Sequence, residues 1–124
     1  MLGNIPFLDL FFTAYVECAL WSSTDDNGHP MDRTFKDTDL APETVSKMQR
    51  DCLKFYTENN LQDFGNHELK QAGHDFWLSR CGHGSGFFDS DLPEPQRTLL
   101  QDAARHFGNC DLYKGDDGKL YVSP

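Results

Sequence analysis

The chain has 124 residues, of which 38% are hydrophobic and 13% aromatic, and its 20 acidic and 11 basic residues give a net charge of −9. This length fits one domain spanning residues 1–124. The negative charge argues against direct nucleic-acid binding, because Lys and Arg carry phosphate contacts. Asp9 and Glu17 interrupt the first apolar run, which argues against a signal peptide and a membrane-spanning helix, so we expect a cytoplasmic protein.

The four cysteines are widely separated, and no CxxC motif is present. This spacing does not match a zinc ribbon or a thioredoxin-like motif. In a reducing cytoplasm we expect all four to be free thiols, with the buried ones behaving as small hydrophobic residues.

The first predicted element is a helix over residues 5–21. Leu8, Tyr15 and Ala19, with Phe11 or Phe12, recur at spacings of three and four, which is typical of a helical stripe. A polar connection over residues 22–39 follows, with turn chemistry at 26–28.

A second helix should begin between Asp39 and Pro42, because Asp39 can cap it and Pro42 suits a first turn. It should end near residues 59–60, or continue to Phe64. Asn66 can cap a short third helix that Gly73 ends.

Residues 74–89 predict a hairpin. Phe76–Leu78 favour a strand, residues 81–86 form a glycine-rich turn, and residues 87–88 begin the return strand. A fourth helix follows Pro93 and Pro95, with Gly108 as its C-cap candidate. A second hairpin spans residues 110–122, with its turn at 115–118.

These elements predict an α+β fold in which a small antiparallel sheet of two hairpins packs against three or four helices. The inner face of the sheet should carry Phe76, Leu78 and one of Phe87 or Phe88. We expect it to face Phe11 or Phe12, Tyr15 and Phe107.

Residues 80–85 hold the best candidate for chemistry. Cys81 and His83 could pair as a nucleophile and a base, and a metal could be held by His67, His74, Cys81 and His83. The spacing matches no standard zinc pattern, and the simpler interpretation is a glycine turn with surface histidines. We therefore predict no catalytic residue, metal or cofactor. A small enzyme centred on His74, Arg80 and His83 is left as an alternative.

A second alternative is a single-stranded nucleic-acid binder that stacks bases on exposed aromatic side chains. Trp77, Phe87 and Phe88 would form the platform. Such a site needs a basic groove, and only Lys70 and Arg80 lie nearby in the sequence. The composition therefore disfavours this alternative.

Four segments carry a resemblance to a known family. They are residues 18–32, 41–48, 72–89 (AGHDFWLSRCGHGSGFFD) and 111–122 (DLYKGDDGKLYV). The chain resembles a family of small, uncharacterised proteins encoded by tailed bacteriophages, and the likeness covers most of its length. It implies a location in the infected bacterial cytoplasm. Members of this family carry a polar residue such as Asn at the position of Cys81, which implies that Cys81 is not a shared nucleophile or ligand.

The leading hypothesis is a small acidic phage accessory protein that binds and modulates or inhibits a host or phage protein. Its acidic residues would compete for a basic surface, in one form by imitating DNA phosphates. The residues expected to contact the partner are Arg80, His83, Ser85, Asp25, Asp26, Asp89, Asp91, Asp116 and Asp117.

Overall fold

The computed structural model describes residues 8–24, 28–81, 86–87 and 90–123. Its helices are α1 (Leu8–Ser22), α2 (Pro42–Glu58), α3 (Asn66–Cys81) and α4 (Gln96–Arg105), and its strands are β1 (Asp111–Lys114) and β2 (Leu120–Ser123). Short 3-10 helices in the described ranges connect them: η2 (Met31–Arg33), η3 (Asp37–Asp39) and η4 (Leu61–Asp63). The fold is α+β, as the sequence predicted.

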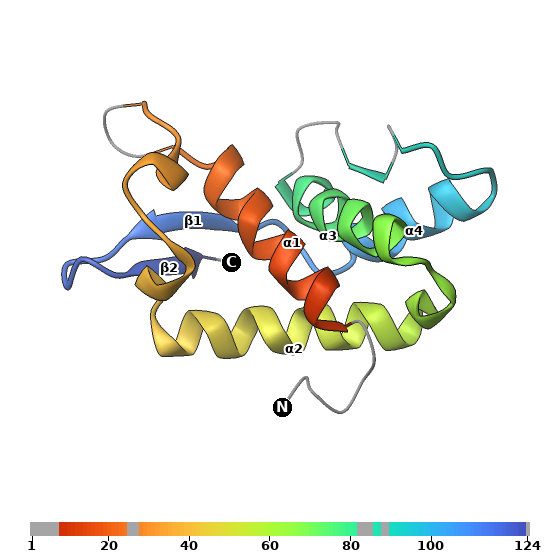
Figure 1. Ribbon diagram of the computed structural model, residues 1–124, viewed down its shortest axis with the longest axis horizontal. Helices are drawn as coiled ribbons and strands as arrows, with labels where there is room; N and C mark the ends of the chain where they lie inside the picture. The colour runs from red at the N-terminus through yellow and green to blue at the C-terminus, as the bar shows by residue number, and fades with distance from the viewer. Residues whose placement is uncertain (1–7, 25–27, 82–85, 88–89, 124) are drawn as a thin grey trace.

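The helices form the body of the molecule, and the hairpin flanks them (Figure 1). Helix α1 packs mainly against α3 and also crosses α2. The hairpin is joined to the start of α2, because the carbonyl oxygen of Leu120 accepts hydrogen bonds from Ala41 N (2.9 Å) and Thr44 Oγ1 (3.0 Å). The turn of the hairpin and helix α4 lie at opposite ends of the long axis (Figure 1).

The prediction of a hairpin over residues 74–89 is wrong, because residues up to Cys81 continue helix α3. Leu69, Ala72 and Phe76 are buried at helical spacing, so one face of this helix supplies the core. This packing overrides the strand preference of residues Phe76–Leu78.

The prediction that Gly73 ends the third helix is also wrong. It is buried in the middle of α3, where the helix meets α1. A Cβ atom at this position would lie 2.5 Å from the carbonyl oxygen of Phe11 and 2.8 Å from Cβ of Ala14. The glycine therefore permits the close approach of two helix backbones.

The prediction for the second helix is confirmed at both ends. Pro42 is its first residue, and the helix ends at Glu58, where the side-chain amide of Asn59 donates to the carbonyl oxygen of Phe55 (2.9 Å). Asp39 does not cap this helix. Its carboxylate instead accepts the backbone N–H of Lys36 (2.8 Å), which stabilises η3.

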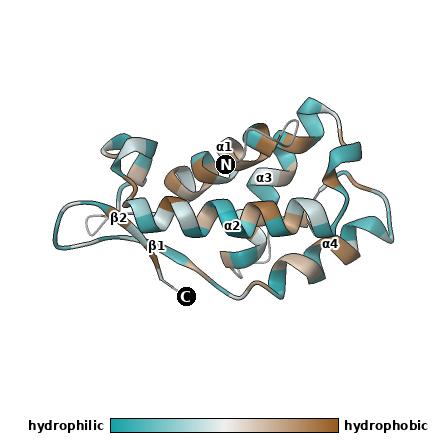
Figure 2. Ribbon diagram, turned by 90° about the horizontal axis from the view of Figure 1, so that it is seen from below, coloured by the Kyte–Doolittle hydropathy of each residue, from teal (hydrophilic) through white to brown (hydrophobic). Residues whose placement is uncertain are grey.

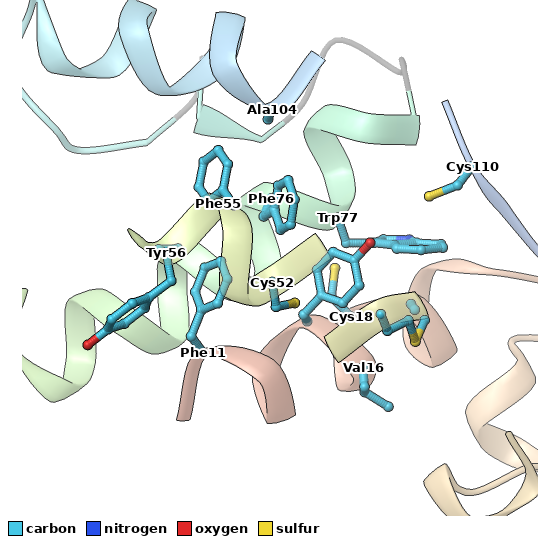
Figure 3. Close-up of a cluster of buried hydrophobic side chains, with 14 of the residues drawn as sticks. Phe11, Val16, Cys18, Cys52, Phe55, Tyr56, Phe76, Trp77, Ala104 and Cys110 are labelled. Atoms are coloured by element: carbon cyan, nitrogen blue, oxygen red, sulfur yellow. The ribbon is translucent and has the colours of Figure 1, made fainter. Parts of the chain in front are cut away.

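Aromatic side chains from different elements fill the centre of the core (Figure 3). Phe55 of α2 and Phe76 of α3 stack with their ring centroids 4.2 Å apart. Phe76 also contacts Phe11, Tyr15 and Phe107, as the sequence predicted, although it does so from a helix. Each buried aromatic residue removes about 150–250 Å² of surface from water, so these few side chains supply a large part of the apolar area that folding buries.

The second predicted hairpin is confirmed. Tyr113 pairs with Tyr121, and Leu112 pairs with Val122, in an antiparallel register. Leu112 and Leu120 are buried on the face toward the helices, whereas Tyr113 points away from them and is exposed. The alternation of the two faces follows from the two-residue period of a strand.

Candidate functional site

The structure separates the predicted partner-contacting residues. Asp91 is exposed in the segment that leads to α4, and Asp116 and Asp117 are exposed in the turn between β1 and β2. These two regions lie at opposite ends of the molecule in both ribbon views (Figures 1 and 2). The other predicted acidic and turn residues, Asp25, Asp26, His83, Ser85 and Asp89, lie outside the described part of the chain.

Arg80 was predicted to contact a partner, and this is wrong because its side chain is only 2% exposed. Its Nη1 atom donates to Asp51 Oδ2 (2.7 Å) and to the hydroxyl of Tyr15 (3.0 Å). Its remaining donors reach the carbonyl oxygens of Phe107 and Gly108, both at 3.1 Å. The guanidinium group therefore joins α1, α2, α3 and the segment that precedes β1.

The residues of the enzyme alternative are not assembled among the described residues. Arg80 is engaged in the internal network, and His83 lies outside the described ranges. Within those ranges no group of three His, Cys, Asp or Glu side chains is placed to hold a metal ion. All four cysteines are free, as predicted.

The surroundings of Cys81 disfavour its thiolate form. Burial, and then the neighbouring Cys110, raise the pKa of this thiol to about 12. We expect Cys81 to react with Ellman's reagent at pH 7.5 about 10- to 100-fold more slowly than glutathione, because the thiolate is the nucleophile. Labelling followed by peptide mass mapping would measure this rate for each cysteine. A rate at Cys81 equal to that of glutathione would contradict the prediction and restore the thiol as a candidate nucleophile.

The stacking platform proposed for single-stranded nucleic acid is not present. Trp77 and Phe87 are both fully buried, and the indole N–H of Trp77 donates to the hydroxyl of Ser22 (3.0 Å). Phe88 lies outside the described residues. Because bases can stack only on accessible ring faces, Trp77 and Phe87 cannot serve this role.

A cleft of about 340 Å³ lies between α3 and the segment of residues 90–93. Three carboxylates line it, from Glu68, Asp75 and Asp91. The remaining described lining residues are Phe64, His67, Gln71, Ala72, Ser90, Leu92 and Pro93. The described part of the lining contains no Lys or Arg. The cleft therefore combines apolar walls with negatively charged side chains.

Helix α3 positions most of the polar groups of the cleft. Glu68, Gln71 and Asp75 lie at spacings of three and four, so they share one face of the helix. Glu68 accepts the backbone N–H of Gly65 (3.0 Å), and Gln71 donates to Asp75 Oδ1 (3.2 Å). Asp75 is only 4% exposed, whereas Glu68 and Asp91 face solvent.

Asp91 was predicted from the sequence, whereas Glu68 and Asp75 were not. The available signal was the spacing of these two acidic residues, which places them on one helical face only if the helix passes through Gly73. Because the helix was predicted to end at Gly73, the two acidic residues were assigned to different elements.

The cleft suits a cationic group on an aliphatic stem, because the stem can lie against Leu92 and Pro93 while the charge meets carboxylates.

Within the described ranges, no helix is both long enough and apolar enough to cross a membrane. No model of a known protein family matches the chain, and neither the curated proteins nor the solved structures contain a significant match to it.

Proposed function

We propose that this chain is a small acidic phage accessory protein that binds a host or phage protein and modulates or inhibits it. The observation that carries the proposal is the cleft between α3 and residues 90–93, where carboxylates meet an apolar wall. A protruding Lys or Arg side chain of the partner would enter this cleft.

The charge of the whole protein supports the same kind of partner. With a net charge of −9, the protein attracts a basic surface over a distance set by ionic screening, about 10 Å at 0.1 M salt. Such attraction mainly raises the rate of association and makes it sensitive to salt. The cleft would then supply the specific contact, because charged hydrogen bonds strengthen when water is excluded from them.

The resemblance of residues 72–89 and 111–122 to tailed-phage proteins, which is drawn from the sequence, would place this role in the cytoplasm of an infected bacterium. The form of the proposal in which the protein imitates DNA needs carboxylates spaced along one continuous face. The exposed carboxylates of Asp91 and of the β1–β2 turn lie at opposite ends of the molecule. We therefore propose the insertion of a basic side chain into the cleft as the main contact.

The proposal predicts that neutralising the cleft weakens partner binding beyond the effect of net charge. The double variant Glu68→Gln, Asp91→Asn keeps the shapes of both side chains and removes two charges from the cleft. We expect it to bind a protein captured from bacterial lysate about 10-fold or more weakly, since a hydrogen bond to a charged group contributes roughly 1.5–3 kcal/mol. Biolayer interferometry with the captured protein would measure the loss.

The matched control is Asp32→Asn, Glu58→Gln, which removes two exposed charges elsewhere and leaves the same net charge. We expect this control to slow association by 2- to 3-fold at low salt and to have no effect at high salt. Equal losses for the two double variants would show that the cleft contributes no specific contact. Capture of no protein at either salt concentration would refute the proposed function itself.

A further inference from the structure

We propose that the outer face of the β1–β2 hairpin binds an arginine side chain of the partner protein, through the rings of Tyr113 and Tyr121 and the carboxylates beside them. This inference rests on the proposed function only in requiring a basic partner. It concerns the hairpin, which lies at the opposite end of the molecule from helix α4 (Figure 2).

The register of the hairpin places two tyrosine rings side by side on this outer face. Tyr113 and Tyr121 are directly paired across the strands, and their ring centroids lie 5.9 Å apart with a 28° angle between the planes. Tyr113 is 46% exposed although it is a large aromatic residue. An accessible tyrosine face attracts a cation through its quadrupole, and a planar guanidinium group also stacks on it.

The position of the Tyr121 ring is built into the turn. Its hydroxyl donates to Asp117 Oδ2 (2.7 Å), and the other carboxylate oxygen accepts the backbone N–H of Lys119 (3.0 Å). A Cβ atom at Gly115 would lie 2.5 Å from the Tyr121 ring, so only glycine at this position lets the ring lie against the turn. The Tyr121 ring is therefore held in place before any ligand binds.

The charges around the two rings favour a cation. The hydrogen bond from Tyr121, followed by that from the Lys119 amide, lowers the pKa of Asp117, so this carboxylate stays ionised near neutral pH. Asp111 points to the same outer face, two residues from Tyr113 on β1. Asp116 lines the shallow depression beside the rings together with Lys114. The carboxylates of Asp111, Asp116 and Asp117 outnumber this one positive charge of the described lining, so the balance favours a cation.

The faces of the two rings are not occupied by cations of the chain itself. In the described ranges the cation–π contacts belong to the helical body, where Lys54 lies over Phe107 and Arg80 lies over both Phe76 and Phe107. Lys114 borders the depression, but its Cβ points to the opposite side of the strand from Tyr113, and within this described hairpin no cation–π contact joins it to either ring. An arginine from outside the chain can therefore stack on Tyr113 while its N–H groups reach the Asp117 or Asp111 carboxylates.

A titration with small peptides tests this inference without knowledge of the partner. The probe is an acetylated and amidated Gly-Gly-Arg-Gly-Gly peptide, with citrulline and lysine in place of arginine as comparisons, because citrulline keeps the shape and removes the charge. We expect the arginine peptide to shift the ring resonances of Tyr113 and Tyr121 in NMR spectra, with millimolar affinity. The lysine peptide should bind about 2- to 5-fold more weakly and the citrulline peptide should cause no shift.

Variants locate the binding to the rings. We expect Tyr113→Leu to weaken the arginine peptide by about 2- to 5-fold or more, since it removes the π face and retains apolar bulk. Asp117→Asn should weaken it by a similar factor, whereas the cleft variant Glu68→Gln, Asp91→Asn should leave the ring shifts unchanged. Circular dichroism would verify that each variant is folded.

Three results would overturn the inference: equal shifts with the citrulline peptide, unchanged affinity in Tyr113→Leu, or ring shifts that follow protein concentration without peptide. The third result would identify a second copy of the chain as the occupant of this face. Shifts confined to the amides of α3 would support the cleft and not the hairpin. The two proposals can therefore fail separately.

Discussion

Replacement of Arg80 by alanine is expected to reduce the free energy of unfolding by about 3–5 kcal/mol, because it removes a buried side chain together with its hydrogen bonds to α1, α2 and the segment that precedes β1, and leaves a cavity between them. Asp51 then keeps its ion pair with Lys47, whose Nζ atom lies 3.0 Å from Asp51 Oδ2. The guanidinium group is 2% exposed and contacts Asp51, Tyr15 and the carbonyl oxygens of residues 107 and 108. Native proteins of this size are stable by about 5–15 kcal/mol, so the variant should be close to unfolding. Urea denaturation followed by the fluorescence of buried Trp77 would measure the loss.

Arg97→Ala is the matched control, because it removes the same type of side chain from an exposed ion pair. Its Nη2 atom lies 3.5 Å from Glu94 Oε2, and both side chains face solvent. We expect a loss of about 0–1 kcal/mol, as for most surface ion pairs. If Arg80→Ala cost no more than the control, the Arg80 network would not hold the helices to the hairpin segment.

Gly86→Ala is expected to be the other strongly destabilising change, with a loss of about 2–5 kcal/mol. Gly86 has a φ of +103° and is buried against α3, where a Cβ atom would collide with the hydroxyl of Ser79. The same atom would lie 2.8 Å from the carbonyl oxygen of Asp75. Backbone strain and overpacking therefore act in the same direction.

The packing at Gly86 matters because it anchors the next residue. The backbone N–H of Phe87 donates to Ser79 Oγ (3.1 Å), and that hydroxyl donates to Gln101 Oε1 of α4 (2.8 Å). Phe87 is fully buried and stacks on Phe55 with centroids 5.6 Å apart. A displaced Gly86 would therefore loosen the contact between α3 and α4 as well as the aromatic core.

Gly118→Ala separates the two contributions at Gly86. Gly118 has a similar φ, +83°, but no atom lies within 4 Å of the position of its Cβ. We expect this control to lose about 1–2 kcal/mol from backbone strain alone. The same urea titration applies to both variants, and equal losses would show that the space around Gly86 can adjust without cost.

The elements with strong local signals were predicted correctly from the sequence. Pro42 marks the first turn of α2, the prolines at 93 and 95 precede α4, and glycines bound the turn of the β1–β2 hairpin. Each of these signals acts through the backbone of its own segment, since proline restricts φ and glycine permits turn geometry. No distant part of the chain is needed for these signals to act.

Helix α3 and the cleft could not be predicted in this way. Gly73 is equally compatible with a helix end and with a close helix crossing, and only the backbone of α1 against it distinguishes the two. The cleft depended on that distinction, because Glu68 and Asp75 share a face only in a continuous helix. Asp91 was identified by its charge, but its neighbours across the cleft come from a different element.

The sequence by itself determined the α+β class, three of the four helices, the final hairpin, the aromatic core and the negative charge of the surface. Those properties follow from local backbone preferences and from composition. The tertiary structure alone decided that residues 74–81 are helical, that Arg80 is buried, and which carboxylates face one another. The physical reason is that a buried guanidinium is stable only when Asp51, Tyr15 and two carbonyl groups from separate segments converge on it.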